Sequence, residues 1–190
     1  MPIRSFVAIP VPSAMADALG DVAARMAYQD KSNAVRWVDQ ENYHITLAFL
    51  GEQQEADLDQ LAGCLDEHIS SNNVSISLKH CSPFPEGKPK LIAAMVEGND
   101  GLRELHQQTR AAINATSIVI DKRRFIPHIT VGRYRHSKNH FVGAIPTSLE
   151  LAAEIIELGI FESTLTSRAA EYQALYRFPF EDYEYALDEI

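Results

Sequence analysis

A four-residue pattern that occurs twice constrains this chain more than any other feature. The two copies are His44-Ile45-Thr46-Leu47 and His128-Ile129-Thr130-Val131. Successive side chains of a β-strand point to opposite faces of its sheet. If both copies form strands, the His and Thr of each copy share one face, and the aliphatic residues point into the core. The pattern therefore predicts two strands that each present an imidazole beside a hydroxyl, and two such strands can enclose one reacting group.

The hydrophobic periodicity around each copy predicts a repeated order of elements. In the first half we expect strands at 3–9, 43–50 and 74–79, and helices at 13–29, with Ser13 as N-cap, and 56–70. In the second half we expect strands at 91–96, 117–120, 125–134, 155–161 and 172–178, and helices at 100–114 and 146–153. The similar order in both halves indicates a duplicated α+β unit.

A segment with three prolines and one glycine, residues 81–89, interrupts this pattern and is expected to be a loop that connects two lobes. A chain of 190 residues is long enough for one domain. We expect a single domain over 1–190, with approximate lobes at 1–82 and 90–190 and exchange of strands between them. A pseudo-twofold axis would then bring the two copies of the pattern face to face.

The overall composition points to the cytoplasm. No apolar run approaches the roughly 20 residues that a bilayer-spanning helix needs, and the first residues do not follow the pattern of a signal peptide. Cys64 and Cys81 have no CxxC spacing, so we expect reduced thiols. These features predict a cytoplasmic protein with no membrane partner, and a monomer is the default expectation.

The charge distribution is uneven along the chain. The net charge is −9, which argues against broad, nonspecific binding of nucleic acid. One window of the sequence nevertheless has no acidic residue and holds six basic ones, Lys122, Arg123, Arg124, Arg133, Arg135 and Lys138. This window surrounds the second copy of the pattern, so it is either a solvated flank of a strand or a local surface for phosphates.

Two imidazoles and two hydroxyls suit phosphoryl chemistry. One neutral ring can take a proton from an attacking hydroxyl, while one protonated ring gives a proton to the leaving oxygen. Thr46 and Thr130 can donate hydrogen bonds to nonbridging phosphate oxygens. Arg133 lies three residues after Thr130, and its fork of N–H donors fits phosphate oxygens. This reasoning identifies His44 and His128 as a pair without saying which is the acid.

Other sites are less compatible with the sequence. Two histidines can bind a metal, but hydrolytic metal sites usually add carboxylates or cysteines, and no HExxH or DxD pattern lies nearby. The chain has no P-loop and no G-x-S-x-G elbow. The remaining alternative is structural, because threonine is a common strand residue without any role in binding. We therefore expect no metal and no cofactor.

The two His-x-Thr-x patterns resemble those of the two-histidine (2H) phosphoesterase superfamily. The surrounding residues are similar to its RNA 2',3'-cyclic phosphodiesterase branch, also called 2'-5' RNA ligases. The similar segments are 4–9, 44–51 after Trp37, 84–85, 124–133, 158–163 and Tyr172. The chain departs from this branch in the loop around Cys81 and Ser82, in strand 91–96, which lacks a Trp, and at 168–170. These departures affect the mouth of the expected site and leave both patterns intact.

The resemblance implies a fold and a reaction. The fold would be α+β and bilobal, with two antiparallel sheets, helices outside and a central cleft between the sheets. The reaction would open RNA 2',3'-cyclic phosphate ends to 2'-phosphomonoesters, with 2'-5' ligation of RNA, including tRNA halves, as the reverse of a related step. His44 would be the acid and His128 the base, while Thr46, Thr130 and Arg133 would hold the phosphate without metal or ATP.

Two further hypotheses stay open on the sequence alone. The same chemistry could act on a small cyclic phosphate or cyclic nucleotide instead of an RNA end. Alternatively, the same cleft could hold a nucleotide or RNA end without turning it over. The acidic bulk of the chain favours a small substrate, whereas the basic window at 122–138 favours an RNA backbone.

Overall fold

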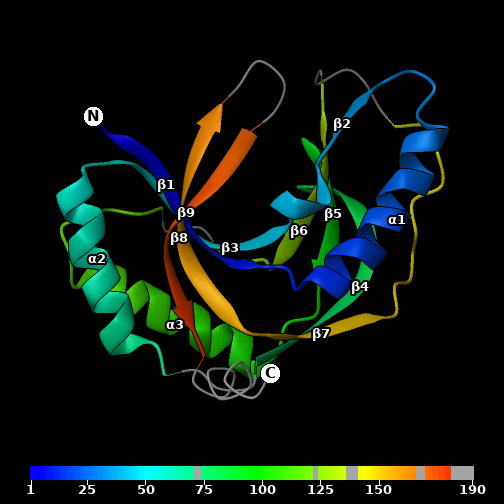
Figure 1. The fold of residues 1–190 in the computed structure, drawn as a ribbon. Helices are drawn as coiled ribbons and strands as arrows, with labels where there is room; N and C mark the ends of the chain where they lie inside the picture. Colours follow the sequence, from blue (N-terminus) through cyan, green and yellow to red (C-terminus); the bar gives the residue numbers. More distant parts are fainter. Residues whose placement is uncertain (71–73, 122–123, 136–140, 166–169, 181–190) are drawn as a thin grey trace, which may run out of the picture.

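The computed structural model describes residues 1–70, 74–121, 124–135, 141–165 and 170–180 (Figure 1). Its strands are β1 Ile3–Pro10, β2 Val35–Trp37, β3 His44–Gln53, β4 Val74–Phe84, β5 Leu91–Val96, β6 His128–Tyr134, β7 Leu151–Ile155, β8 Glu157–Leu165 and β9 Ala170–Pro179. Its helices are α1 Ser13–Gln29, α2 Glu55–His68 and α3 Asp100–Asn114, with a short 3-10 helix η1 at Gln40–Asn42. No described helix is long and apolar enough to cross a lipid bilayer.

All strand pairings described in the structure are antiparallel. The strand order is β7-β4-β5-β6-β3-β1-β8-β9, with β2 beside β6. At the centre, β3 and β6 pair through one residue pair, Ile45 opposite Ile129. The predicted α+β class with antiparallel sheets and outer helices is confirmed, and the two expected sheets join at this pair into one curled sheet (Figure 1).

The helices cover the curled sheet in an exchanged arrangement. The first helix, α1, contacts β2, β6 and β7, whereas α2 and α3 pack on each other, α2 against β9 and α3 against β3 and β4 (Figure 1). Elements from each half of the sequence therefore contribute to both sides of the molecule. The division into lobes at 1–82 and 90–190 with strand exchange stays a prediction about domain organisation.

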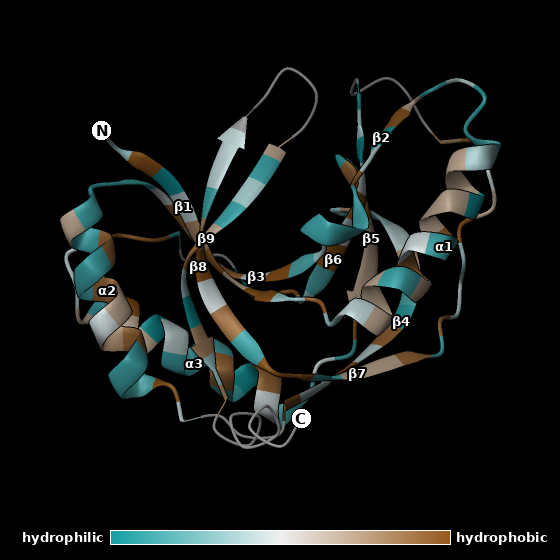
Figure 2. Ribbon diagram, in the orientation of Figure 1, coloured by the Kyte–Doolittle hydropathy of each residue, from teal (hydrophilic) through white to brown (hydrophobic). Residues whose placement is uncertain are grey.

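The buried residues follow the predicted periodicity. In α3, for example, Leu102, Leu105 and Ile113 are buried on one face, and the side chain of Asn99 accepts a hydrogen bond from the Leu102 amide at 2.8 Å. Figure 2 shows the resulting change between hydrophobic and hydrophilic residues along helices and strands. The predicted N-cap at Ser13 is wrong, because Pro12 occupies that position and α1 has no side-chain cap.

Three local predictions differ from the structure. Residues 81–84 are not loop but the end of β4, which pairs there with β5. Strand β4 tolerates Pro83 because β7 covers only its first half, so an amide is not needed at the free edge. The short helix expected at 146–153 is instead irregular chain followed by β7, which pairs with β4 along its whole length. Residues 117–120 form no strand.

Candidate active site

The register between β3 and β6 brings the two motif copies together. The antiparallel pair Ile45 and Ile129 sets position 44 beside position 130, and position 46 beside position 128. Both isoleucines have 0% exposed surface, while the His and Thr residues on either side are partly exposed. The structure thus places two imidazoles and two hydroxyls on one face of the sheet, diagonally arranged across two strands.

A β-bulge adds Arg133 to this face. Between Ile92 and Ala93 of β5, the partner on β6 advances by two residues, so Val131 is the extra residue. Val131 and Gly132 are both buried, and the alternation resumes one step later. In a regular strand, Arg133 and Thr130 would point to opposite faces. The bulge returns Arg133 to the face of Thr130, which the spacing in the sequence could not show.

The corresponding bulge in β3 makes the two copies different. The register of β1 against β3 shifts between Val7 and Ala8, which leaves Leu47 as the extra residue. The position that matches Arg133 is therefore Phe49, whose side chain is 69% exposed. One wall of the site carries a guanidinium where the other carries an exposed aromatic ring.

Backbone carbonyls orient both imidazoles in the same way. Nδ1 of His44 lies 2.7 Å from the Asn42 carbonyl oxygen, and Nδ1 of His128 lies 2.8 Å from the Ile126 carbonyl oxygen. A carbonyl only accepts, so each Nδ1 donates and each Nε2 carries the lone pair. Within the described residues, neither Nε2 has a hydrogen-bond partner. Both rings are thus set to exchange a proton at Nε2.

Aromatic side chains surround the two imidazoles. The His44 ring lies 4.9 Å from Phe6 and 5.0 Å, edge to face, from Tyr172, measured between centroids. The His128 ring lies 4.5 Å from Phe84. The resemblance singles out Tyr172 and Phe84, but the sequence reasoning did not identify Phe6 as a neighbour of His44. The signal that could have identified it was its position on the face of β1 opposite the core residues.

This environment lowers the pKa of both histidines. Burial lowers the pKa of His44 from 6.5 to about 4, the Asn42 carbonyl opposes this shift, and Arg133 and His128 add to it. The pKa of His128 is also lowered, first by burial and then by Arg133, against the Ile126 carbonyl. Both rings are therefore neutral at pH 7 when no anion is bound.

The lowered pKa of His44 predicts a pH dependence of stability. The folded ring resists protonation until about pH 4, whereas the unfolded ring takes its proton near pH 6.5. Its contribution to the free energy of unfolding is therefore fully present above about pH 6.5 and lost as the pH falls toward 4. Urea unfolding across this range should show that the free energy of unfolding falls more steeply with decreasing pH for the wild type than for His44→Gln. Equal slopes in wild type and His44→Gln would refute the prediction.

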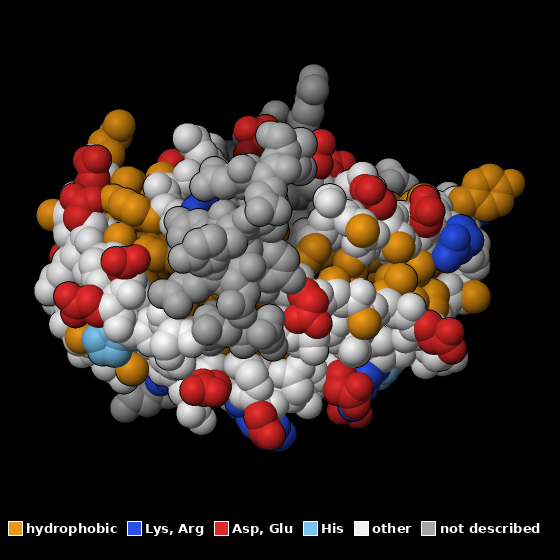
Figure 3. Space-filling view, turned by 60° about the horizontal axis from the view of Figure 1, so that its bottom comes forward, with side chains coloured by type: hydrophobic (Ala, Val, Ile, Leu, Met, Phe, Trp, Pro, Cys, Tyr) orange, Lys and Arg blue, Asp and Glu red, His pale blue; other side chains and the backbone are white. Residues whose placement is uncertain are grey.

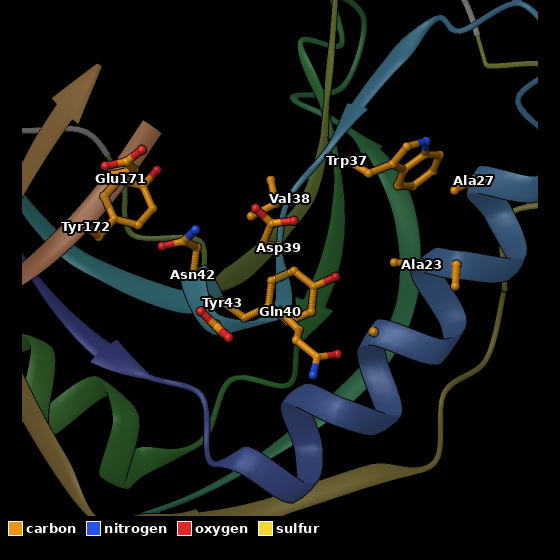
Figure 4. Close-up of a pocket in the computed structure, with 13 residues that line it drawn as sticks. Ala23, Ala27, Trp37, Val38, Asp39, Gln40, Asn42, Tyr43, Glu171 and Tyr172 are labelled. Carbon is orange, nitrogen blue, oxygen red and sulfur yellow. The ribbon is translucent and has the colours of Figure 1, made fainter. Parts of the chain in front are cut away.

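A cavity of about 730 Å³ adjoins the His44 side of the site (Figure 4). It lies between α1, the segment from Trp37 to Tyr43 and the start of β9. Asn42 and Tyr172, which both contact His44, belong to its lining. Its other polar lining residues include Asp39, Gln40, Glu41 and Glu171, and no Lys or Arg of the described segments lines it. The surroundings of the site are thus acidic on the His44 side and basic at Arg133.

The acidic residues are otherwise dispersed. Figure 3 brings the bottom of Figure 1 forward and shows Asp and Glu side chains spread over that face, with basic side chains beside some of them. Three of the six residues in the predicted basic window, Lys122, Arg123 and Lys138, lie outside the described residues. Among the described residues, no group of three or more His, Cys, Asp or Glu could hold a metal ion.

Comparison with known proteins shows which proteins the chain is similar to. The sequence profile of the LigT-like phosphoesterases matches residues 9–93. A protein named RNA 2',3'-cyclic phosphodiesterase from Thermotoga maritima is 26% identical over 185 residues, covering 94% of this chain and 96% of its own. A protein of the same name from Aquifex aeolicus is 29% identical over 171 residues, covering 84% of this chain and 90% of its own.

Solved structures share the fold. The crystal structure of Escherichia coli LigT complexed with 3'-AMP superposes with a TM-score of 0.79 at 22% identity, covering 95% of this chain and 99% of LigT. A protein from Thermus thermophilus also gives a TM-score of 0.79 at 22% identity, covering 94% of this chain and 98% of its own. The matched profile, the relatives along nearly the whole chain and the shared fold confirm the resemblance. The chain is similar to the LigT-like phosphoesterases, and its curated relatives along nearly its whole length are enzymes named RNA 2',3'-cyclic phosphodiesterase.

Proposed function

We propose that this enzyme hydrolyses 2',3'-cyclic phosphate ends of RNA to 2'-phosphomonoesters. The observation that carries the proposal is the matched orientation of His44 and His128, which each donate from Nδ1 to a backbone carbonyl and keep Nε2 available on one face. Acid–base cleavage of a phosphate ester needs two such groups. The names of the relatives from Thermotoga maritima and Aquifex aeolicus support the cyclic phosphate as substrate.

In the proposed reaction, Nε2 of one histidine takes a proton from water as the water oxygen bonds to phosphorus. The bond between phosphorus and the ribose 3' oxygen breaks, and Nε2 of the other histidine gives its proton to that oxygen. The product carries a 2'-phosphate and a 3'-hydroxyl, and a proton exchange with solvent restores the starting state. Thr46 and Thr130 donate to the nonbridging oxygens, and Arg133 balances their charge.

The roles of the two histidines depend on the bound phosphate. The family resemblance makes His44 the acid, but burial holds its pKa near 4 in the empty site. An anion beside an imidazole favours the charged ring. In this assignment the incoming phosphate raises the pKa of His44, so the acid is formed by substrate binding while His128 stays neutral as the base.

Incubation with a 2',3'-cyclic nucleotide in EDTA tests the proposal. We expect turnover without added metal, and phosphorus NMR should identify the product as the 2'-phosphate. A 3'-phosphate product would contradict the proposed geometry, and absence of any product would contradict the activity. The alternative binding module predicts tight binding of a 2'-phosphate without turnover.

The same site would also allow 2'-5' ligation. If the hydroxyl of a second RNA end replaces the attacking water, the same base takes its proton, the same acid protonates the leaving 3' oxygen, and the two groups exchange roles only when the 2'-5' linkage is cleaved in reverse. We propose RNA ends, including tRNA halves, as partners of a monomeric, cytoplasmic enzyme that needs no cofactor. The exposed basic residues near the second motif favour RNA over a small cyclic phosphate as the substrate.

A further inference from the structure

A second arginine lies beside Arg133 on the site face. Strand β2 pairs with the end of β6, and its register sets Arg36 opposite Arg133. Opposed residues of an antiparallel pair point to the same face, with Cβ atoms about 4.5–5.5 Å apart. Both arginines are exposed. The two guanidinium groups are therefore neighbours across the strands.

The packing around Gly132 determines the direction of these side chains. A Cβ on Gly132 would lie 2.5 Å from Val35 Cγ1 and 3.2 Å from Trp37 Cε3. Val35 and Trp37 therefore cover the inner face of β6, toward α1. Arg36, which lies between them in β2, must point to the opposite face, where Arg133 also lies.

Among the described residues, no carboxylate pairs with either member of this pair. Among the residues that the structure describes, neither Arg36 nor Arg133 takes part in an ion pair or a side-chain hydrogen bond. Like charges directly opposite each other destabilise a sheet. The arrangement does not serve the fold, and it fits a ligand that carries negative charge between or beside the two groups.

The two arginines lie at different distances from the histidines. Arg133 is close enough to lower the pKa of both His44 and His128. Strand β2 lies along the end of β6 beyond the point where β3 pairs with it, at the top of Figure 1. Arg36 is thus one strand farther from the reacting phosphate than Arg133.

We infer that Arg36 and Arg133 form a two-phosphate subsite that recognises an RNA strand. Arg133 contacts the cyclic phosphate, and Arg36 contacts the neighbouring phosphodiester of the same chain. This inference rests on the proposed function and adds to it a residue that distinguishes an RNA end from a mononucleotide. Arginine suits this role, because its fork of donors binds phosphate oxygens in pairs.

Binding measurements test the subsite separately from turnover. The probes are a short single-stranded RNA that ends in a 2'-phosphate, followed by fluorescence anisotropy, and a 2'-mononucleotide as competitor. For Arg36→Ala we expect affinity for the RNA to fall about tenfold at low salt, and the slope of log affinity against log salt to fall by about 0.7. The affinity for the mononucleotide should change much less, so the ratio between the two ligands decreases.

Two further variants complete the experiment. Arg36→Lys keeps the charge and should keep the salt slope while recovering part of the affinity. Arg25→Ala removes an exposed arginine of α1 and should leave both ligands unaffected. Equal loss for RNA and mononucleotide, or no loss for either, would overturn the inference. Absence of turnover in the wild type would overturn the proposed hydrolysis instead, since binding of RNA is measured on its own.

Discussion

Replacement of His44 or His128 by alanine is expected to lower kcat for 2',3'-cyclic phosphate hydrolysis by a factor of about 10²–10⁴. In the proposed reaction each imidazole supplies or removes a proton at Nε2, and no other described side chain near the pair is positioned by a backbone carbonyl in the same way. In the double variant kcat should fall by much less than the product of the two single factors, because the proposed acid and base act in one step. Initial rates with a cyclic nucleotide in EDTA measure this effect.

The matched control for both variants is His68→Ala. His68 lies in the last turn of α2, and its Nδ1 also lies close to a backbone carbonyl, that of Cys64, but outside the site. It should retain wild-type kcat. The far-ultraviolet circular dichroism of all three variants should match the wild type, since the replaced rings are partly exposed. Retention of activity in either His44→Ala or His128→Ala would exclude the paired mechanism.

Replacement of Arg133 by alanine is expected to lower kcat/KM by a factor of about 10²–10³, the effect of removing one donor that stabilises charge in a transition state. Arg133→Lys should recover only part of the loss, because an ammonium lacks the paired donors of a guanidinium. Arg133 also lowers the pKa of both histidines. Arg133→Ala should therefore raise both values, which an NMR titration of the ring protons can follow.

Arg135→Ala is the control for this prediction. Arg135 is exposed and lies two residues after Arg133, beyond the end of β6. Its removal should leave kcat/KM and the pKa values of His44 and His128 as in the wild type. If Arg133→Ala changed the histidine pKa values but not kcat/KM, the residue would tune the empty site without holding the phosphate.

The sequence predicted the strands of the motif copies because their side chains alternate with period two. The alternation also gave the correct faces, since Ile45 and Ile129 are fully buried while the His and Thr residues beside them are partly exposed. The same reasoning failed where two signals competed. Three prolines outweighed the strand pattern at 81–84, although Pro83 lies where β4 has a free edge and needs no amide partner.

Other features of the site had no local signal. The carbonyls of Asn42 and Ile126 belong to the backbone, so residue identity could not reveal that they orient the two rings. The bulge at Val131 depends on the partner strand, and regular alternation would have placed Arg133 on the wrong face. The neighbour relation of Arg36 and Arg133 joins residues nearly a hundred positions apart, through strand β2 that sequence patterns did not predict.

The sequence by itself determined which groups are present: two imidazoles, two hydroxyls and a basic second motif, each attached to a strand by short-range periodicity. Only the tertiary structure decided how these groups face one another. One residue pair, Ile45 opposite Ile129, sets the diagonal arrangement, and a bulge on each strand makes the two walls unequal. Register and bulges arise from pairing between strands distant in sequence, so they depend on packing energies that no local pattern contains.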